Sequence, residues 1–154
     1  MPILGFIKHD CVKVPLVSTD KSGAIRELVD LAYNCGEISD RDDVLEAVMA
    51  REAMMPTGIG HGVAAPHAKA DSVTRLTGAL GVTSQPMEFD SVDGEPVRLI
   101  ILMVSPASEN GPYVEALTHI SRLFRNESFR ERLIDAGSAD ELISVVQAEE
   151  GRGE

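Results

Sequence analysis

The residues best suited to chemistry in this chain lie between Pro56 and Lys69, in the sequence PTGIGHGVAAPHAK. Pro66 fixes the backbone immediately before His67, so the imidazole is held in one direction. Three glycines precede this pair, Gly58, Gly60 and Gly62. A glycine-rich loop bends where other residues cannot, and it can direct several N–H groups toward one anion. Such a loop followed by a rigidly placed histidine indicates a histidine that meets a phosphate.

The chemistry that His67 offers is nucleophilic. A neutral imidazole is a competent nucleophile near pH 7, and phosphohistidine passes its phosphoryl group onward readily. Phosphoryl transfer requires mainly positioning and compensation of negative charge. Arg51, just before the loop, offers a bidentate guanidinium, and Thr57 offers a hydroxyl donor. The same residue types also fit a tight turn that leads into a buried strand, so both interpretations stay open.

The remaining histidines show no pattern of a metal site. A site built on His61 and His67 would need a third ligand, and neither an i,i+4 histidine pair nor a CxxC motif accompanies them. His9 and His119 have no partner at a meaningful spacing and are interpreted as ordinary surface or packed residues. We therefore expect neither a metal nor a cofactor.

Composition indicates one soluble globular domain. A chain of 154 residues with 44% hydrophobic and 25% charged residues is long enough and apolar enough for a real core. The longest apolar run, Val97 to Val104, carries Arg98 and is too short to span a membrane, and the start does not resemble a signal peptide. Cys11 and Cys35 are interpreted as small buried hydrophobes in a reducing cytosol.

The net charge of -11 argues against sequence-independent nucleic-acid binding, which depends on Lys and Arg neutralising phosphates. The acidity fits a protein that docks onto a basic patch of a partner, and it fits equally a protein that is merely kept soluble.

The elements that must position the site begin with a short helix or lid over 3–7 and a strand over 12–16. That strand alternates apolar and polar residues, and Pro15 favours an edge position. A helix is predicted from an Asp20 N-cap to a stop at Gly36.

A second helix ends at Pro56 and is predicted to open at a variant capping box formed by Ser39 and Asp42. Residues 76–82 form a predicted strand, and the aliphatic run 97–104 is typical of a central strand covered on both faces. Three closing helices are predicted: one opening at Pro112, one ending at Gly137, and one opening at the Ser138–Glu141 capping box. Because helices and strands intermix throughout, the predicted fold is α/β, with one sheet and helices packed on it.

The string RE…TGIGxGxAxPH, which runs from Arg51 to His67, resembles the signature of enzyme IIA proteins of the fructose/mannitol type. These proteins belong to the bacterial phosphoenolpyruvate-dependent phosphotransferase system and include its nitrogen-regulatory branch. The resemblance covers nearly the whole chain. It implies one enzyme IIA-like phosphocarrier domain over residues 1–148, with a single mixed β-sheet flanked by helices. Residues 149–154 would be a frayed tail.

The resemblance also implies a cytoplasmic phosphotransferase-type phosphocarrier that works through a phosphohistidine. His67 falls on the phosphoacceptor, charged by the histidine phosphocarrier protein HPr, and Arg51 falls on the active-site arginine. In the sugar branch the phosphoryl group passes to a cysteine of a IIB domain. In the nitrogen branch, phosphorylation tunes the binding of regulatory partners. No nucleic acid and no membrane insertion are implied.

The chain departs from the family pattern at two positions. Tyr113 stands where the family commonly has a second active-site histidine, and a tyrosine donates a hydrogen bond but forms no cation near neutral pH. His61 stands where the family often has a small polar residue, and we hypothesise that it partly replaces the missing imidazole beside His67. An alternative is that His61 simply tops an exposed loop. The predicted phosphate-binding residues are thus Thr57, Gly58, Gly60, His61 and Tyr113.

Three functions remain. The first is a regulatory, nitrogen-type phosphocarrier, which the missing second histidine favours. The second is a sugar-specific IIA component that passes phosphate to a IIB domain. The third is a degenerate module that keeps the fold, binds a partner or senses a small anion, and never accepts phosphate.

Overall fold

The computed structural model describes residues 2–152, in which one mixed sheet forms the centre of the fold. Its strands are β1 (Val12–Leu16), β2 (Gly58–Gly60), β3 (Val63–Ala64), β4 (His67–Lys69), β5 (Thr77–Met87) and β6 (Val97–Ser105). They lie in the order β1-β5-β6-β3-β2, and β4 also pairs with β6. The predicted α/β class with a single mixed sheet is confirmed.

β6 is the central strand, as its continuous aliphatic run predicts. It pairs antiparallel with β5 on one side and parallel with β3 and β4 on the other. All of its residues except Arg98 are buried, because helices cover both faces of the sheet. β1 lies at one end of the order and pairs with β5, so its predicted edge position is also confirmed.

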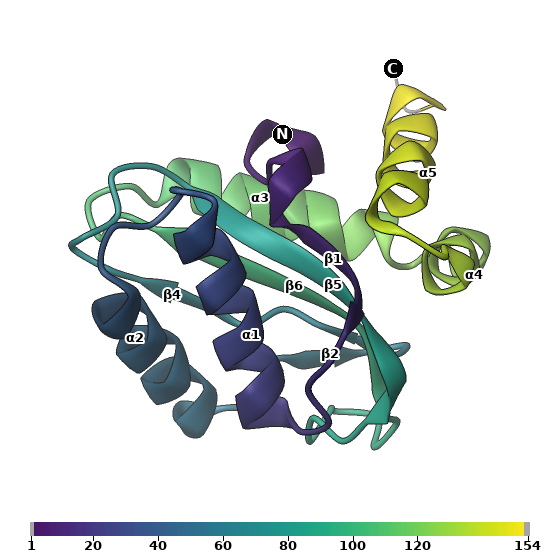
Figure 1. Ribbon diagram of the computed structural model, residues 1–154, viewed down its shortest axis with the longest axis horizontal. Coiled ribbons are helices and arrows are strands. Elements are labelled where there is room, and N and C mark those ends of the chain that lie inside the picture. Colours follow the sequence, from purple (N-terminus) through teal and green to yellow (C-terminus); the bar gives the residue numbers. More distant parts are fainter. Residues whose placement is uncertain (1, 153–154) are drawn as a thin grey trace.

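Five helices lie in the described part of the chain: α1 (Lys21–Asn34), α2 (Arg41–Met54), α3 (Gly111–Leu123), α4 (Glu127–Asp135) and α5 (Ala139–Arg152). Figure 1 shows α1 and α2 in front of the sheet, α3 behind it, and α4 beside α5 at one end. α2 packs on β4, the short strand that begins at His67. The helix that carries Arg51 is thereby set against the strand that carries His67.

The first two helices begin at aspartate caps. The Asp20 carboxylate accepts the Gly23 N–H at 2.8 Å, which confirms the predicted N-cap of α1. The predicted capping box of α2 is wrong by one residue. Asp40, with an extended backbone, accepts the Asp43 N–H at 3.1 Å, and this aspartate satisfies the free donor in place of Ser39.

The two ends of the described chain are both packed. A 3-10 helix, η1 (Ile3–Gly5), buries Ile3, so segment 3–7 is the short helix of the two alternatives and not a lid; a second one, η2 (His9–Cys11), follows. At the other end α5 continues to Arg152, where the sequence predicts a frayed tail from residue 149. The Glu150 carboxylate accepts the Ile3 N–H at 2.9 Å, which ties this helix to η1. Residues 153–154 lie outside the described residues.

No helix within residues 2–152 combines the length and the apolar character needed to cross a membrane.

Candidate active site around His67

His67 lies in a pocket of about 450 Å³ between the end of α2, strand β4 and the start of α3. It begins β4 and pairs with Met103 of β6, so its backbone is held by the central strand. The pocket is lined by Ala47, Ala50, Arg51, Met54, His67, Ala68, Lys69 and Tyr113. Three predicted site residues, Arg51, His67 and Tyr113, are therefore brought together from three separate elements.

The His67 imidazole has a fixed orientation and a fixed tautomer. Its Nδ1 lies 2.8 Å from the Ala65 carbonyl oxygen. A carbonyl oxygen only accepts, so Nδ1 carries the proton and donates it to this oxygen. The neutral ring then presents the Nε2 lone pair as its free nucleophile. Pro66 lies between Ala65 and His67, and its fixed backbone angle restrains the position of the imidazole relative to the Ala65 carbonyl.

Burial in the pocket lowers the pKa of His67 below its usual 6.5, and the Arg51 charge lowers it further. The hydrogen bond to the Ala65 carbonyl and the Glu52 carboxylate act in the opposite direction without reversing the shift. His67 is consequently neutral at neutral pH, which is the form in which an imidazole attacks phosphorus.

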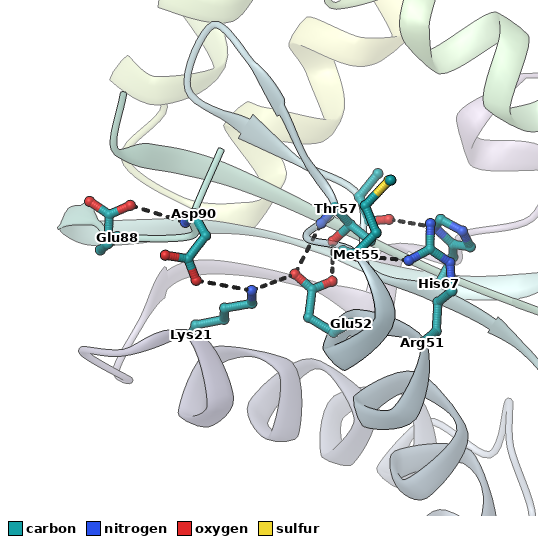
Figure 2. A network of polar contacts seen from close by, with 9 residues as sticks. Lys21, Arg51, Glu52, Met55, Thr57, His67, Glu88 and Asp90 are labelled. Carbon is teal, nitrogen blue, oxygen red and sulfur yellow. Dashed lines mark hydrogen bonds and ion pairs between the residues drawn. The ribbon is translucent and has the colours of Figure 1, made fainter. Parts of the chain in front are cut away.

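Arg51 supplies positive charge to the pocket of the imidazole, and in Figure 2 its guanidinium and the His67 ring lie at the same end of the polar network. Its Nη1 donates to the Met55 carbonyl oxygen at 2.8 Å, which anchors one arm of the fork where α2 ends. No carboxylate within residues 2–152 forms an ion pair with Arg51, so its charge stays available for an anion.

Tyr113 projects from the first turn of α3 toward His67. The two ring centroids lie 5.4 Å apart at an interplanar angle of 48°. Burial raises the pKa of Tyr113 above its usual 10.0, and the nearby Arg51 charge only partly offsets the effect. The phenol thus stays protonated at neutral pH and offers a hydrogen-bond donor, while no second imidazole lines the described pocket.

Thr57 has a different place from the one expected. Its side chain is buried, and its hydroxyl donates to Glu52 Oε2 at 2.5 Å, while its N–H donates to Glu52 Oε1 at 3.1 Å. Lys21 Nζ approaches Glu52 Oε1 to 2.9 Å and Asp90 to 3.5 Å, as Figure 2 shows. The Thr57 hydroxyl is therefore committed to Glu52 and holds the chain against the end of α2.

The glycine stretch forms a β-hairpin turn and not an anion cradle at His67. β2 and β3 pair antiparallel, and the turn between them places His61 at φ 59° and Gly62 at φ 77°. The His61 N–H donates to the Asp93 carboxylate at 3.0 Å, so the anion that this turn binds belongs to the chain itself. Of the two interpretations left open, the tight turn leading into a buried strand describes these glycines.

Gly58 has a packing reason instead of a phosphate-binding one. A Cβ at this position would lie 2.2 Å from the Ser91 Oγ, so only glycine allows the hairpin to approach Ser91 this closely. Gly60, which precedes His61 in the turn, has φ 93° and lies beside the Asp93 side chain.

His61 does not lie beside His67. It lines a separate pocket of about 210 Å³ with Ile59, Gly60, Ser121, Phe124 and Arg125. The two pockets share no lining residue. The hypothesis that His61 replaces the missing imidazole has no geometric support, and the alternative of an exposed loop tip fits its position.

Three residues of this region were given no role from the sequence: Glu52, Lys21 and Lys69. Glu52 and Lys21 carry no local pattern that links them to Thr57, because the network joins α1, α2 and the loop after α2. Lys69 is two residues from His67 on a strand, and that spacing puts both side chains on one face. This spacing could have identified Lys69 as a neighbour of His67 from the sequence alone.

Among residues 2–152, no three His, Cys, Asp or Glu side chains are grouped so that they could hold a metal ion. Cys11 is buried, as predicted, whereas Cys35 is half-buried and its Sγ donates to the Asp10 carbonyl oxygen at 3.0 Å. His119 is a packed residue, with Nε2 2.5 Å from the Glu150 carboxylate.

The family model that describes the phosphoenolpyruvate-dependent sugar phosphotransferase system, EIIA 2, matches residues 5–149. A fructose-specific EIIA component of this system from Haloferax volcanii is 36% identical over 126 residues, which cover 82% of each chain. The fructose-specific EIIABC component of Bacillus subtilis is 32% identical over 95% of this chain, but the chain spans only 23% of that relative's length.

Solved structures extend the comparison. The nitrogen regulatory protein IIA-Ntr from Neisseria meningitidis superposes with a TM-score of 0.85 at 30% identity, covering 92% of this chain and 97% of that one. Enzyme IIA mannitol from Escherichia coli, in its complex with phosphorylated enzyme IIB mannitol, gives a TM-score of 0.79 over 93% and 99% of the two chains. At 20% identity that likeness concerns the fold alone.

Proposed function

The chain belongs to the EIIA 2 family of the phosphoenolpyruvate-dependent sugar phosphotransferase system. We propose that the Nε2 atom of His67 accepts a phosphoryl group and passes it on. The observation that carries the proposal is the state of the imidazole. Its Nδ1 proton is held by the Ala65 carbonyl, its neutral form is favoured, and Arg51 lines the same pocket.

The transfer follows from this geometry. The Nε2 lone pair attacks phosphorus of a phosphohistidine on an HPr-like carrier, whose ring is protonated on its other nitrogen. The N–P bond of the donor breaks, and the donor ring leaves with the electron pair as a neutral imidazole. The Nδ1 proton remains on His67, where the Ala65 carbonyl stabilises the positive ring that forms. Arg51 compensates charge on the equatorial oxygens. No further proton donor is needed.

The regulatory role is favoured over a dedicated sugar role. The likeness to IIA-Ntr of Neisseria meningitidis supports it, and so does Tyr113, which offers no second imidazole for onward transfer. In this role the phosphorylation state of His67 tunes the binding of a regulatory partner in the cytoplasm.

A sugar role is the second candidate, because the fructose-specific component of Haloferax volcanii is 36% identical to this chain. EIIA proteins work with IIB domains, as in the complex with enzyme IIB mannitol. In that role, phosphorylated His67 would pass its phosphoryl group to a IIB cysteine.

The test is incubation with phosphoenolpyruvate, enzyme I and HPr, followed by intact mass measurement. We expect one acid-labile phosphoryl group on the wild-type chain and none on His67→Ala. His61→Ala and His9→Ala are matched controls outside the pocket and should be phosphorylated like the wild type. An adduct that survives in His67→Ala would overturn the site, and no adduct on the wild type would favour the degenerate module.

The two roles separate in a second step. The purified phosphorylated chain is mixed with a fructose-type IIB domain, and the phosphoryl group is followed by mass. Complete transfer within seconds would favour the sugar role, whereas retention on His67 would favour the regulatory one.

A further inference from the structure

Lys69 shares the pocket of His67 and is the third cationic or nucleophilic side chain in it. The two residues are the ends of β4, with the buried Ala68 between them. Side chains two residues apart on a strand project to the same side. Lys69 is exposed, so its ammonium is free to meet an anion that enters the pocket.

Lys69 differs from the other lysines of the chain in its charge partners. The three others each form an ion pair of 2.7 to 2.9 Å with a largely buried glutamate: Lys8 with Glu37, Lys13 with Glu27, and Lys21 with Glu52. Lys69 has no acidic partner within residues 2–152. The chain has a net charge of -11, so a lysine ammonium without a carboxylate partner is unusual in it. This ammonium, of Lys69, lies at the pocket of His67.

Tyr113 links this ammonium to the imidazole. Lys69 Nζ lies 5.7 Å from the centroid of the Tyr113 ring, within the range of a cation–π contact. The same ring lies 5.4 Å from the His67 ring. The tyrosine is thus in contact with both side chains and limits where the flexible lysine can place its charge.

We propose that Lys69, held over the ring of Tyr113, is the second cation that compensates the phosphoryl group on His67, together with Arg51. This inference rests on the proposed function. Arg51 approaches from the end of α2 and Lys69 from β4, so the charge of the phosphoryl oxygens is met from two elements.

The reacting step places Lys69 outside the bonds that change. The Nε2–P bond forms, the donor's P–N bond breaks, and the ammonium neither gives nor receives a proton. Its effect is electrostatic, on the oxygens of the group in transit.

The test uses phosphoramidate as the donor, because this small molecule phosphorylates without protein docking and releases ammonia. Phosphorylation of the full chain at fixed pH and salt is followed by intact mass for the wild type, Lys69→Met and Lys69→Arg. We expect Lys69→Met, which keeps the length but not the charge, to slow the reaction about tenfold. Lys69→Arg should recover most of that loss. Lys13→Met, which removes a lysine of edge strand β1, is the matched control.

A second arm tests the role of the ring. If Tyr113 positions the ammonium, Lys69→Met should cost much less in a Tyr113→Leu background than in the wild type, because the two residues act as a unit. Purely additive effects would overturn that part of the inference.

The inference and the proposed function fail differently. If the wild type is phosphorylated on His67 and Lys69→Met reacts equally fast with phosphoramidate, Lys69 has no electrostatic role and the function stands. The same conclusion follows if Lys69→Met slows only the reaction with HPr, by raising its KM, since that marks a docking residue. If neither donor phosphorylates His67 of the wild type, the proposed function itself fails.

Discussion

His61 and His67 stand six residues apart on one glycine-rich stretch, yet the fold gives them opposite surroundings. His61 occupies the exposed tip of the β2–β3 turn, where its backbone N–H binds Asp93. His67 opens β4, half-buried, with its ring nitrogen on the Ala65 carbonyl and its open side toward Arg51 and Tyr113.

The difference shows what makes an imidazole a nucleophile in this molecule. At residue 61 the backbone N–H makes the hydrogen bond to Asp93, and that contact does not require an imidazole side chain. At residue 67 a carbonyl selects the tautomer, burial keeps the ring neutral, and a guanidinium supplies charge for the oxygens of an incoming group. The predictions below test whether this environment, and not the presence of a histidine near glycines, sets the chemistry.

The largest effect should come from removing the guanidinium beside His67. We expect Arg51→Ala to slow phosphorylation of His67 by HPr about 10² to 10³-fold in single-turnover measurements, the size found when one preorganised donor to a transition state is lost. Arg51→Lys should restore part of the rate, because it keeps the charge but not the fork.

Arg125 supplies the matched control, since it lines the pocket of His61 and, among the described contacts, its side chain donates only to the Ser121 carbonyl oxygen. Arg125→Ala should react like the wild type. Equal losses in both variants would mean that general surface charge controls the reaction, and the contrast between the two histidines would lose its basis.

A smaller effect is expected on stability at the start of the same stretch. Glu52 accepts two hydrogen bonds from Thr57 and the ion pair of Lys21 in a buried position. Glu52→Ala leaves the Thr57 hydroxyl and N–H without partners, while Lys21 keeps only the longer contact with Asp90, so we expect the free energy of unfolding to fall by about 1–3 kcal/mol in urea titrations.

Two further variants serve as comparisons for the loss of stability in Glu52→Ala. Glu46→Ala changes an exposed glutamate of the same helix and should stay within about 0.5 kcal/mol of the wild type. Asp93→Ala removes the exposed contact of the His61 turn and should cost less than Glu52→Ala. The reverse order would show that the turn, and not the Glu52–Thr57 contact, holds the stretch in place.

Local patterns predicted much of this fold. The Asp20 cap depends on a hydrogen bond to a residue only three positions along the chain. The continuous aliphatic run of β6 indicates a strand that is buried on both faces. His67 and Arg51 were proposed from their residue types, and Tyr113 was found through the family resemblance; the structure brings all three into one pocket. Their roles in phosphoryl transfer stay predictions until the kinetics are measured.

What failed depended on partners distant in sequence. Thr57 was expected to face a phosphate, but its hydroxyl turns to Glu52, whose charge is in turn met by Lys21 from another helix. The glycine turn was expected to face His67, but Asp93, 32 residues beyond His61, takes its N–H. Spacing along the chain carries no information on which distant carboxylate meets a given donor.

The finest test concerns the pH at which His67 takes up a proton. Burial, aided by Arg51, lowers its pKa below 6.5, so the folded chain holds fewer protons here than the unfolded chain when the pH falls below that value. Its contribution to stability is therefore constant above pH 6.5 and declines below it. An NMR titration of the ring should give a midpoint under 6.5. The rate with phosphoramidate should stay level from pH 8 to 6.5, and fall about tenfold per pH unit only below the midpoint.

The same titration separates burial from charge. Arg51→Ala removes one of the two causes, so the midpoint should rise toward 6.5, while Arg125→Ala should leave it unchanged. A midpoint at or above 6.5 in the wild type would mean that the pocket does not favour the neutral ring. His67 would then owe its reactivity to position alone, and the contrast with His61 would reduce to the carbonyl of Ala65.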